Sequence, residues 1–164
     1  MSIVIGVIYS SRSSEPPIVA SNIPVVTANK PVVAANSSYN ITMKDNPGFC
    51  VELPGGIIDD KTKIQLYTCN NTDSQKWIYN KDTKEIKNND KCIDIQDNVI
   101  SNETPLQIYT CNGSGAQKWD FINNSFKSNS KCMDVKGGVI SSGSALQIYD
   151  CNDSPAQKFT LKTI

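Results

Sequence analysis

The chain has 164 residues, its 16 Lys and Arg balance its 16 Asp and Glu, and it contains no histidine. A chain of this length holds one ordinary domain, which excludes a catalytic domain joined to a separate binding module. The balanced charge argues against a nucleic-acid or anionic-membrane partner, and the lack of histidine removes the usual general base and every Ser/His or Cys/His pair.

The N-terminal part is rich in Pro, Val and Asn. Its apolar segment Ile3 to Tyr9 is the longest in the chain, but it is too short to insert across a membrane. No basic residue precedes it, so it gives no clear signal peptide.

A seven-residue pattern begins at Pro17 and is echoed from Pro24 and from Pro31. Proline at this frequency excludes a coiled coil. We therefore expect residues 1–38 to form an extended arm or linker. The alternative is an arm whose valines pack on its own barrel, on another subunit or on a partner protein, and so support self-association or assembly.

From Cys50 onward, one sequence unit occurs three times. Each copy has a second cysteine 19 residues after the first, an apolar-Gln-apolar-Tyr segment before that second cysteine, and a Gln-Lys-aromatic triplet after it. A unit of about 40 residues cannot bury a core alone, so three copies must share one. We expect one all-β domain over residues 39–164, with repeats of about 39–80, 81–122 and 123–164.

The alternation of side chains predicts which face of each strand is buried. In Ile64-Gln65-Leu66-Tyr67 the aliphatic residues point into the core, and Gln65 and Tyr67 point outward. The same rule puts Ile93 and Ile95 in the core and leaves Cys92 and Asp94 on the outer face. Turn clusters such as Asn80 to Thr83, Asn123-Asn124 and Gly137-Gly138 separate the strands, and helix signals are absent.

The constant cysteine spacing predicts one local disulfide in each repeat: Cys50 to Cys69, Cys92 to Cys111 and Cys132 to Cys151. Closing a loop of about 20 residues contributes about 3 kcal/mol to stability. The alternative is a metal site, but the short paired spacings that zinc requires are missing. The sequence thus indicates neither metal nor cofactor, and the disulfides predict a secreted or otherwise extracytosolic protein.

Together, the repeated Cys-x-Asp, apolar-Gln-apolar-Tyr and Gln-x-Trp motifs resemble the ricin B-chain type lectin domain, from Ile41 to Leu161. The resemblance implies a β-trefoil in which each repeat can hold one shallow sugar site. It also implies that the aspartate accepts bonds from sugar hydroxyls, that the strand aromatic stacks on the sugar, and that the Gln of Gln-x-Trp braces the aspartate. Carboxylates and aromatic rings suit the hydroxyls and the C–H face of a pyranose.

The second and third repeats keep the aspartate, both glutamines and the tyrosine, although Phe159 replaces tryptophan in the third. They are the preferred carbohydrate sites: Asp94, Gln107, Tyr109 and Gln117, and Asp134, Gln147, Tyr149 and Gln157. The first repeat is expected to be weaker, because it has Glu52 in place of aspartate, beside Gln65, Tyr67 and Gln75. Where the family often has asparagine before Gln-x-Trp, this chain has Ser74, Ala116 and Ala156. Glycans of the galactose type or other pyranosides therefore remain open as ligands.

Structural interpretations stand beside the functional ones. Trp77, Trp119 and Phe159 are expected to fill the core, and the glutamines before them either satisfy buried backbone groups or support the site. The aspartates and tyrosines have the alternative of a local turn contact or an exposed strand position without a ligand. Asn70, Asn112 and Asn152 begin glycosylation sequons, but their recurrence favours a structural turn.

The predicted function is a carbohydrate-binding lectin module without catalysis. One alternative is a trefoil inhibitor or scaffold that binds protein through its loops, which would have no reason to repeat the Asp, Gln and Tyr pattern. The other is a glycosidase with paired carboxylates. The recurring acids number one per repeat and lie far apart on a threefold barrel, so no single cleft collects two of them.

Overall fold

The computed structural model describes residues 37–164. The predicted arm, with its proline echo and its apolar N-terminal segment, lies outside the described residues and stays a prediction. Within residues 37–164 the regular structure consists of strands and short 3-10 helices, as the all-β prediction requires. No helix in this range has the length and apolar character needed to cross a bilayer.

Twelve strands and six single-turn 3-10 helices make up the described chain. The strands are β1 (Ser38–Met43), β2 (Phe49–Glu52), β3 (Gln65–Thr68), β4 (Trp77–Asn80), β5 (Glu85–Asn88), β6 (Lys91–Ile95), β7 (Leu106–Thr110), β8 (Asp120–Ile122), β9 (Ser125–Ser128), β10 (Lys131–Val135), β11 (Leu146–Asp150) and β12 (Phe159–Thr163). The 3-10 helices are η1 (Pro54–Gly56), η2 (Asp73–Gln75), η3 (Gln96–Asn98), η4 (Gly115–Gln117), η5 (Lys136–Gly138) and η6 (Pro155–Gln157).

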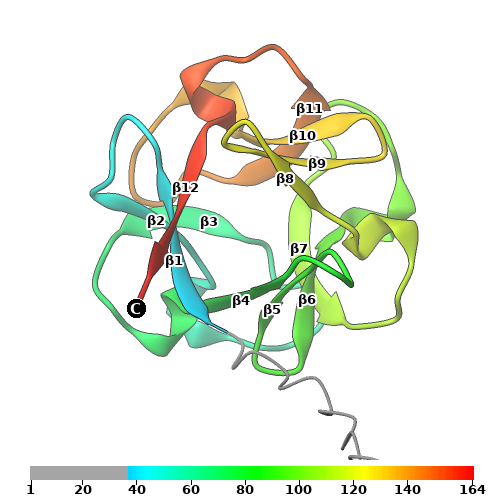
Figure 1. Cartoon of the computed structure of the whole chain (residues 1–164), viewed down its shortest axis with the longest axis horizontal. Coiled ribbons are helices and arrows are strands. Elements are labelled where there is room, and N and C mark those ends of the chain that lie inside the picture. The colour runs from blue at the N-terminus through cyan, green and yellow to red at the C-terminus, as the bar shows by residue number, and fades with distance from the viewer. Residues whose placement is uncertain (1–36) are drawn as a thin grey trace, which may run out of the picture. The chain divides into compact units, whose positions relative to one another are not determined.

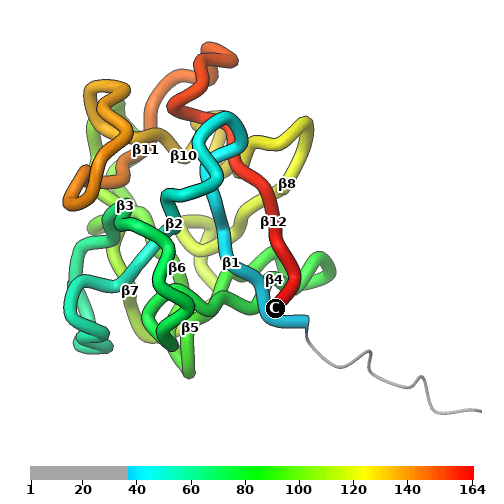
Figure 2. The backbone as a smooth tube through the Cα atoms, turned by 90° about the vertical axis from the view of Figure 1, so that its left-hand side faces the viewer, coloured from blue at the N-terminus to red at the C-terminus, as the bar shows by residue number. Residues whose placement is uncertain are grey.

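The strands form a β-trefoil with three similar lobes, which Figure 1 shows around a central axis. Each lobe contains one antiparallel hairpin, β2–β3, β6–β7 or β10–β11. The remaining strands pair as β1–β4, β4–β5, β8–β9 and β1–β12. Because β12 pairs along the length of β1, the end of the chain lies beside the start of the described part (Figure 2).

Backbone hydrogen bonds link each lobe to the next. The N–H of Ile108 donates to the carbonyl of Thr62 at 2.8 Å, and the N–H of Ile148 donates to the carbonyl of Thr104 at 2.9 Å. The N–H of Leu66 donates to the carbonyl of Ser144 at 2.8 Å, so the three bonds are equivalent under the threefold pattern. The three repeats therefore close around one shared core, as the repeat length predicted.

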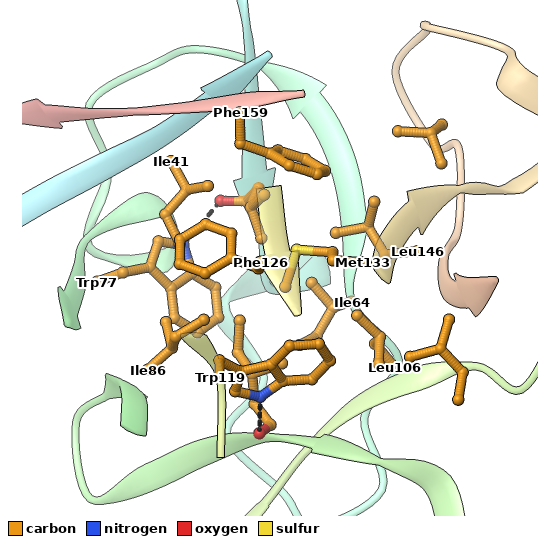
Figure 3. Packing of buried hydrophobic residues seen from close by; sticks show 14 of the residues in the cluster. Ile41, Ile64, Trp77, Ile86, Leu106, Trp119, Phe126, Met133, Leu146 and Phe159 are labelled. Carbon is orange, nitrogen blue, oxygen red and sulfur yellow. Dashed lines mark hydrogen bonds between the residues drawn. The ribbon is translucent and has the colours of Figure 1, made fainter. Parts of the chain in front are cut away.

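The core contains the aliphatic strand residues that the alternation of apolar and polar side chains predicts to be buried (Figure 3). Trp77, Trp119 and Phe159 are fully buried, which confirms their interpretation as core residues. The indole N–H of Trp77 donates to the carbonyl of Val51 at 2.9 Å, and that of Trp119 donates to the carbonyl of Ile93 at 3.1 Å. Phe159 keeps the aromatic volume in the third repeat but has no N–H to donate.

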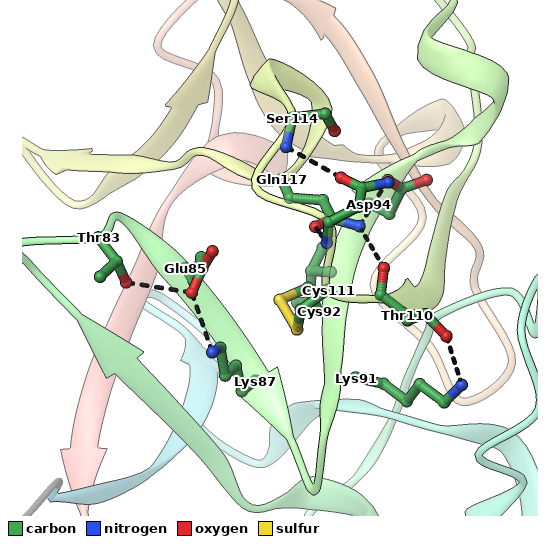
Figure 4. The surroundings of a disulfide bond; sticks show 12 residues. Thr83, Glu85, Lys87, Lys91, Cys92, Asp94, Thr110, Cys111, Ser114 and Gln117 are labelled. Atoms are coloured by element: carbon green, nitrogen blue, oxygen red, sulfur yellow. Dashed lines mark hydrogen bonds and ion pairs between the residues drawn. A yellow bond between two sulfur atoms is a disulfide. The ribbon is translucent and has the colours of Figure 1, made fainter.

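Three disulfides connect the predicted cysteines, Cys50–Cys69, Cys92–Cys111 and Cys132–Cys151, each with a Cα–Cα distance of 5.1 Å. Each bridge joins the first strand of a hairpin to the segment that follows its second strand. Figure 4 shows the second of them beside Asp94 and Gln117. The bridge therefore holds the hairpin next to the turn that carries the Gln of Gln-x-Trp. Local disulfides of this kind are consistent with an oxidising compartment.

Candidate functional site

The candidate site of the second repeat is built on the hairpin β6–β7. Asp94 and Gln107 lie directly opposite each other in the antiparallel register. Gln107 Nε2 donates to Asp94 Oδ1 at 2.9 Å, and Gln117 Nε2, from η4, donates to Asp94 Oδ2 at 3.1 Å. One amide thus holds each carboxylate oxygen, and the carboxylate is fixed in orientation.

Gln117 is fully buried and has further backbone partners. Its Nε2 also donates to the carbonyl of Thr110 at 3.0 Å, and its Oε1 accepts the N–H of Asn112 at 2.8 Å. The side chain therefore satisfies the backbone around the second cysteine and braces Asp94 at the same time. Of the two roles that the sequence left open for this glutamine, structural bracing is present, and support of a sugar site stays a prediction.

The third repeat reproduces this arrangement. Gln147 Nε2 donates to Asp134 Oδ1 at 2.9 Å, and Gln157 Nε2 donates to Asp134 Oδ2 at 3.1 Å. Gln157 also bonds the carbonyl of Asp150 and the N–H of Asn152. The two preferred repeats thus hold their aspartates in the same way.

The first repeat assembles the same network around Glu52, with more donors. Gln65 Nε2 donates to Oε2 at 3.1 Å, and Gln75 Nε2 donates to Oε1 at 3.3 Å. Oε1 also accepts weak bonds from Asn70 Nδ2 at 3.4 Å and from Ser74 Oγ at 3.5 Å. A carboxylate offers about four acceptor positions, so these donors occupy most of the capacity of Glu52.

The carboxylates and glutamines lie on the strand face that the sequence predicts, away from the core. The prediction that this face is exposed to solvent is wrong. Asp94, Asp134 and Glu52 are each 6% exposed, and Gln107 and Gln147 are buried as well. The reason lies in the turns η2, η4 and η6, which fold over the hairpins and bring the second glutamine onto the carboxylate. Alternation within one strand contains no information about a later segment that covers its outer face.

The tyrosines line a shallow hollow in each repeat. The cavity volume is about 260 Å³ around Asp94 and Tyr109, 370 Å³ around Asp134 and Tyr149, and 460 Å³ around Glu52 and Tyr67. Tyr109 and Tyr149 are half-buried, whereas Tyr67 is 41% exposed. All twelve predicted site residues therefore lie at, or bond directly to, the carboxylate of their own repeat.

The repeat pattern predicts turns at the sequon asparagines Asn70, Asn112 and Asn152, and each of them lines the hollow of its own repeat. Each side-chain oxygen accepts the N–H of the residue two positions later, which confirms the structural turn. The same turn leaves the side chain at the hollow. The signal that could have found them is the Cys-Asn dipeptide, which recurs in all three repeats.

Two further lining residues come from a neighbouring repeat. Lys61 of the first repeat lines the hollow of the second, and Glu103 of the second lines the hollow of the third. Asp97 also lines the second hollow. A second carboxylate is therefore present in the second hollow, from Asp97, and in the third hollow, from Glu103, although neither acid recurs in the repeats. A search for recurring residues cannot find these side chains.

Burial raises the pKa of Asp94 and of Asp134 above the ordinary value of aspartate. The bonds from the two glutamines act in the opposite direction, since an amide donor stabilises the ionised form, but desolvation is the larger effect. Both carboxylates are thus less acidic than exposed aspartates. The chemistry that such an ordered carboxylate offers beside a ring is acceptance of hydrogen bonds from a ligand with an apolar face.

The sequence matches the family described as "Ricin-type beta-trefoil lectin domain" over residues 37–159. No curated protein matches the chain. Solved structures with the same fold include the designed threefold-symmetric protein ThreeFoil, with 17% identity, a TM-score of 0.69, and coverage of 77% of this chain and 99% of that chain. The C-half of an earthworm R-type lectin in complex with GalNAc has 14% identity, a TM-score of 0.67, and coverage of 78% and 99%.

The fold also occurs as a small part of a larger chain. A mosquitocidal holotoxin has 22% identity and a TM-score of 0.68, and the match covers 80% of this chain but 18% of the toxin chain. At these identities the solved structures establish the β-trefoil alone. Membership of a family comes from the match over residues 37–159, which covers most of the chain.

Proposed function

This chain belongs to the ricin-type β-trefoil lectin domain family, and from that premise we propose that it is a non-catalytic module that binds pyranosides in the hollows of its second and third repeats. The observation that carries the proposal is a fixed carboxylate with unused acceptor positions beside a tyrosine ring. Asp94 and Asp134 each accept one amide bond per oxygen. About two further acceptor positions then remain on each for vicinal sugar hydroxyls.

Each hollow supplies a complementary set of contacts. The carboxylate accepts charge-assisted bonds from hydroxyls, the ring of Tyr109 or Tyr149 covers the C–H face, and the amide of Asn112 or Asn152 adds a donor at the edge. The earthworm relative was solved with GalNAc, which is a sugar of the same class. We infer a weaker site in the first repeat, because protein donors already occupy Glu52.

The absence of catalysis is part of the proposal. Asp97 and Glu103 add second carboxylates, but both oxygens of Asp94 and of Asp134 are held by amides that donate to them. This arrangement suits an acceptor of ligand hydroxyls better than a group that delivers a proton to a glycosidic oxygen. The three disulfides further support a secreted or extracytosolic place of action.

A glycan array tests the function. Residues 1–164 should bind glycans with accessible pyranosides, and Asp94→Ala/Asp134→Ala should not. Failure of the wild type on every glycan, or equal binding by the double variant, would favour the protein-binding scaffold. Release of sugar from bound glycans during the same incubation would indicate a glycosidase.

Acidification is expected to abolish sugar binding while the fold persists. Binding requires the ionised carboxylate, so it is present above the raised pKa of Asp94 and Asp134 and is lost as the pH falls through that pKa. A folded-state pKa above the unfolded value means that the folded state holds the proton more tightly, so protonation of these two residues favours folding. Aspartates with a lowered pKa, such as Asp60 and Asp150, keep their ion pairs to lower pH.

The measurement is titration calorimetry with a sugar taken from the array, together with fluorescence of the two buried tryptophans over the same pH range. Binding should disappear at a higher pH than the fluorescence transition. Coincident transitions would mean that binding is lost by unfolding, and would contradict the assignment of the two aspartates.

A further inference from the structure

One position in each repeat lies beside the hollow of the next repeat. It is the eleventh residue after the first cysteine, and it is occupied by Lys61, Glu103 and Gly143. The N–H of Lys61 donates to the carbonyl of Ile108 at 2.9 Å, and that of Glu103 donates to the carbonyl of Ile148 at 2.9 Å. Ile108 and Ile148 immediately precede the tyrosines of the second and third hollows, so the two side chains start at a fixed place beside those rings.

The preceding residue in each repeat fastens this loop to its neighbour. Asp60 Oδ1 accepts the N–H of Thr110 at 2.8 Å and the ammonium of Lys91 at 2.7 Å. Asn102 Nδ2 donates to Asp150 Oδ2 at 2.8 Å. Ser142 Oγ accepts the N–H of Thr68 at 3.0 Å. The position beside each hollow is therefore held from both sides.

The backbone at this position favours glycine. Lys61, Glu103 and Gly143 have φ of 73°, 69° and 88°, in the left-handed region where a side chain is disfavoured. Gly143 shows that the fold accepts glycine here. Two charged side chains thus occupy a backbone conformation that disfavours them. Strain of this kind is typical of functional positions, which favours a role for both side chains in the neighbouring hollow.

The charges at this position are opposite, and they are available to a ligand. None of the seven ion pairs in the described residues uses Lys61 or Glu103. Lys61 lines the hollow with Asp94 and Tyr109, whereas Glu103 lines the one with Asp134 and Tyr149. Gly143 brings no side chain to the hollow of the first repeat. That hollow is larger than the other two, and its Tyr67 is more exposed than Tyr109 and Tyr149.

The residue two positions further along strengthens the difference. Lys63 donates from Nζ to Gln107 Oε1 at 3.3 Å and also bonds Gln96, so a second ammonium lies behind a glutamine that lines the second hollow. Its counterparts are Pro105 and Ala145, which carry no charge. In the third repeat no donor replaces Lys63, and the side-chain oxygen of Gln147 is left without a partner among the described residues.

In the second and third hollows, the repeat's own 3-10 turn contributes a charge opposite to that of the residue from the preceding repeat. Asp97 of η3 lines the second hollow, and Lys136 of η5 lines the third. Each of these two hollows therefore has a charge polarity, and the two polarities are opposite. The location of a ligand's charge, more than the net charge of the hollow, must decide which hollow it enters.

We propose that Lys61, supported by Lys63, makes the second hollow selective for a saccharide with an anionic carboxylate or sulfate group directed toward the first repeat, and that Glu103 excludes such a ligand from the third hollow. This inference rests on the proposed function. It makes the chain a lectin with unlike sites, in which a residue of one repeat sets the specificity of the next.

The test is a heteronuclear NMR titration of the intact chain that follows the side-chain amides of Gln107 and Gln147 as reporters of the second and third hollows. The probes are methyl β-galactopyranoside, galacturonic acid and galactose 6-sulfate. At low salt, one or both acidic probes should bind the second hollow about two- to fivefold more tightly than the neutral probe, and the third hollow more weakly than the neutral probe. Salt should reduce both differences.

Lys61→Gly and Glu103→Gly are matched variants, because Gly143 shows that glycine suits this backbone. Lys61→Gly should remove the acidic preference at Gln107 and leave neutral binding within about twofold, while Glu103→Lys should create that preference at Gln147. A preference for carboxylate over sulfate, or the reverse, identifies the source of the anionic group. Equal binding of all three probes, or a preference that survives Lys61→Gly, would overturn the inference alone. Absence of shifts with every probe and on every glycan would overturn the proposed function as well.

Discussion

Asp94→Ala and Asp134→Ala should each remove one sugar site and weaken binding to a multivalent glycan surface by about a hundredfold. A shallow site with one carboxylate, one ring and one or two amides should bind a monosaccharide with a Kd of order millimolar, about 4 kcal/mol. Two such sites that engage one surface gain affinity through effective concentration. Loss of either one removes that gain, while the other site keeps its affinity for free sugar.

The matched control is Glu52→Ala, which removes a carboxylate from the first hollow, where four protein donors already bond it. Titration calorimetry with a monosaccharide from the array should show the stoichiometry fall with each aspartate variant and stay unchanged with Glu52→Ala. A stoichiometry that falls mainly with the glutamate variant would place binding in the first repeat. Circular dichroism of each variant separates loss of binding from loss of fold.

Much of the fold could be predicted because it depends on local patterns that occur three times. The alternation around Ile93, Asp94 and Ile95 defines which side chains enter the core, and constant spacing identifies the disulfide partners. The burial of Asp94 could not be predicted in this way, because it depends on η4 folding over the hairpin. That contact is tertiary and leaves no period in the strand.

The first repeat shows a different limit. The sequence predicts a weaker first site because Glu52 replaces aspartate, yet the Glu52 carboxylate bonds two glutamines at the equivalent positions of its own repeat. The extra methylene is accommodated, and Asn70 and Ser74 provide further donors. The weakness expected for this site therefore has a different cause, which is competition from protein donors for the carboxylate oxygens.

Lys61 and Glu103 could not be found by comparing the repeats, because they differ at the position they share. A search for recurrence treats Lys, Glu and Gly at one position as variation without meaning. Only the structure places each residue beside the hollow of the following repeat. Residues that give each of several similar sites its own specificity are those that a repeat pattern does not reveal.

Trp119→Ala should reduce the free energy of unfolding by about 3–5 kcal/mol, the range for removal of a large buried aromatic side chain. Trp119 is fully buried in the shared core, so the cavity left by the substitution would lie where the three repeats meet. The loss also removes the donor to the carbonyl of Ile93, which is a bond worth about 1 kcal/mol, with a further cost if the carbonyl remains buried without a partner.

The third repeat supplies the control, since Phe159 fills the equivalent position with a ring that has no N–H. Trp119→Phe should keep most of the buried aromatic area and lose the bond to Ile93, so its cost should be well below that of alanine, about 1–2 kcal/mol. Urea unfolding followed by far-ultraviolet circular dichroism, with the disulfides intact, measures both variants. Trp77→Phe should behave in the same way, because Trp77 donates to Val51 as Trp119 does to Ile93. Equal costs for the phenylalanine and alanine variants would mean that the hydrogen bond, and not the volume of the ring, is what the core requires at this position.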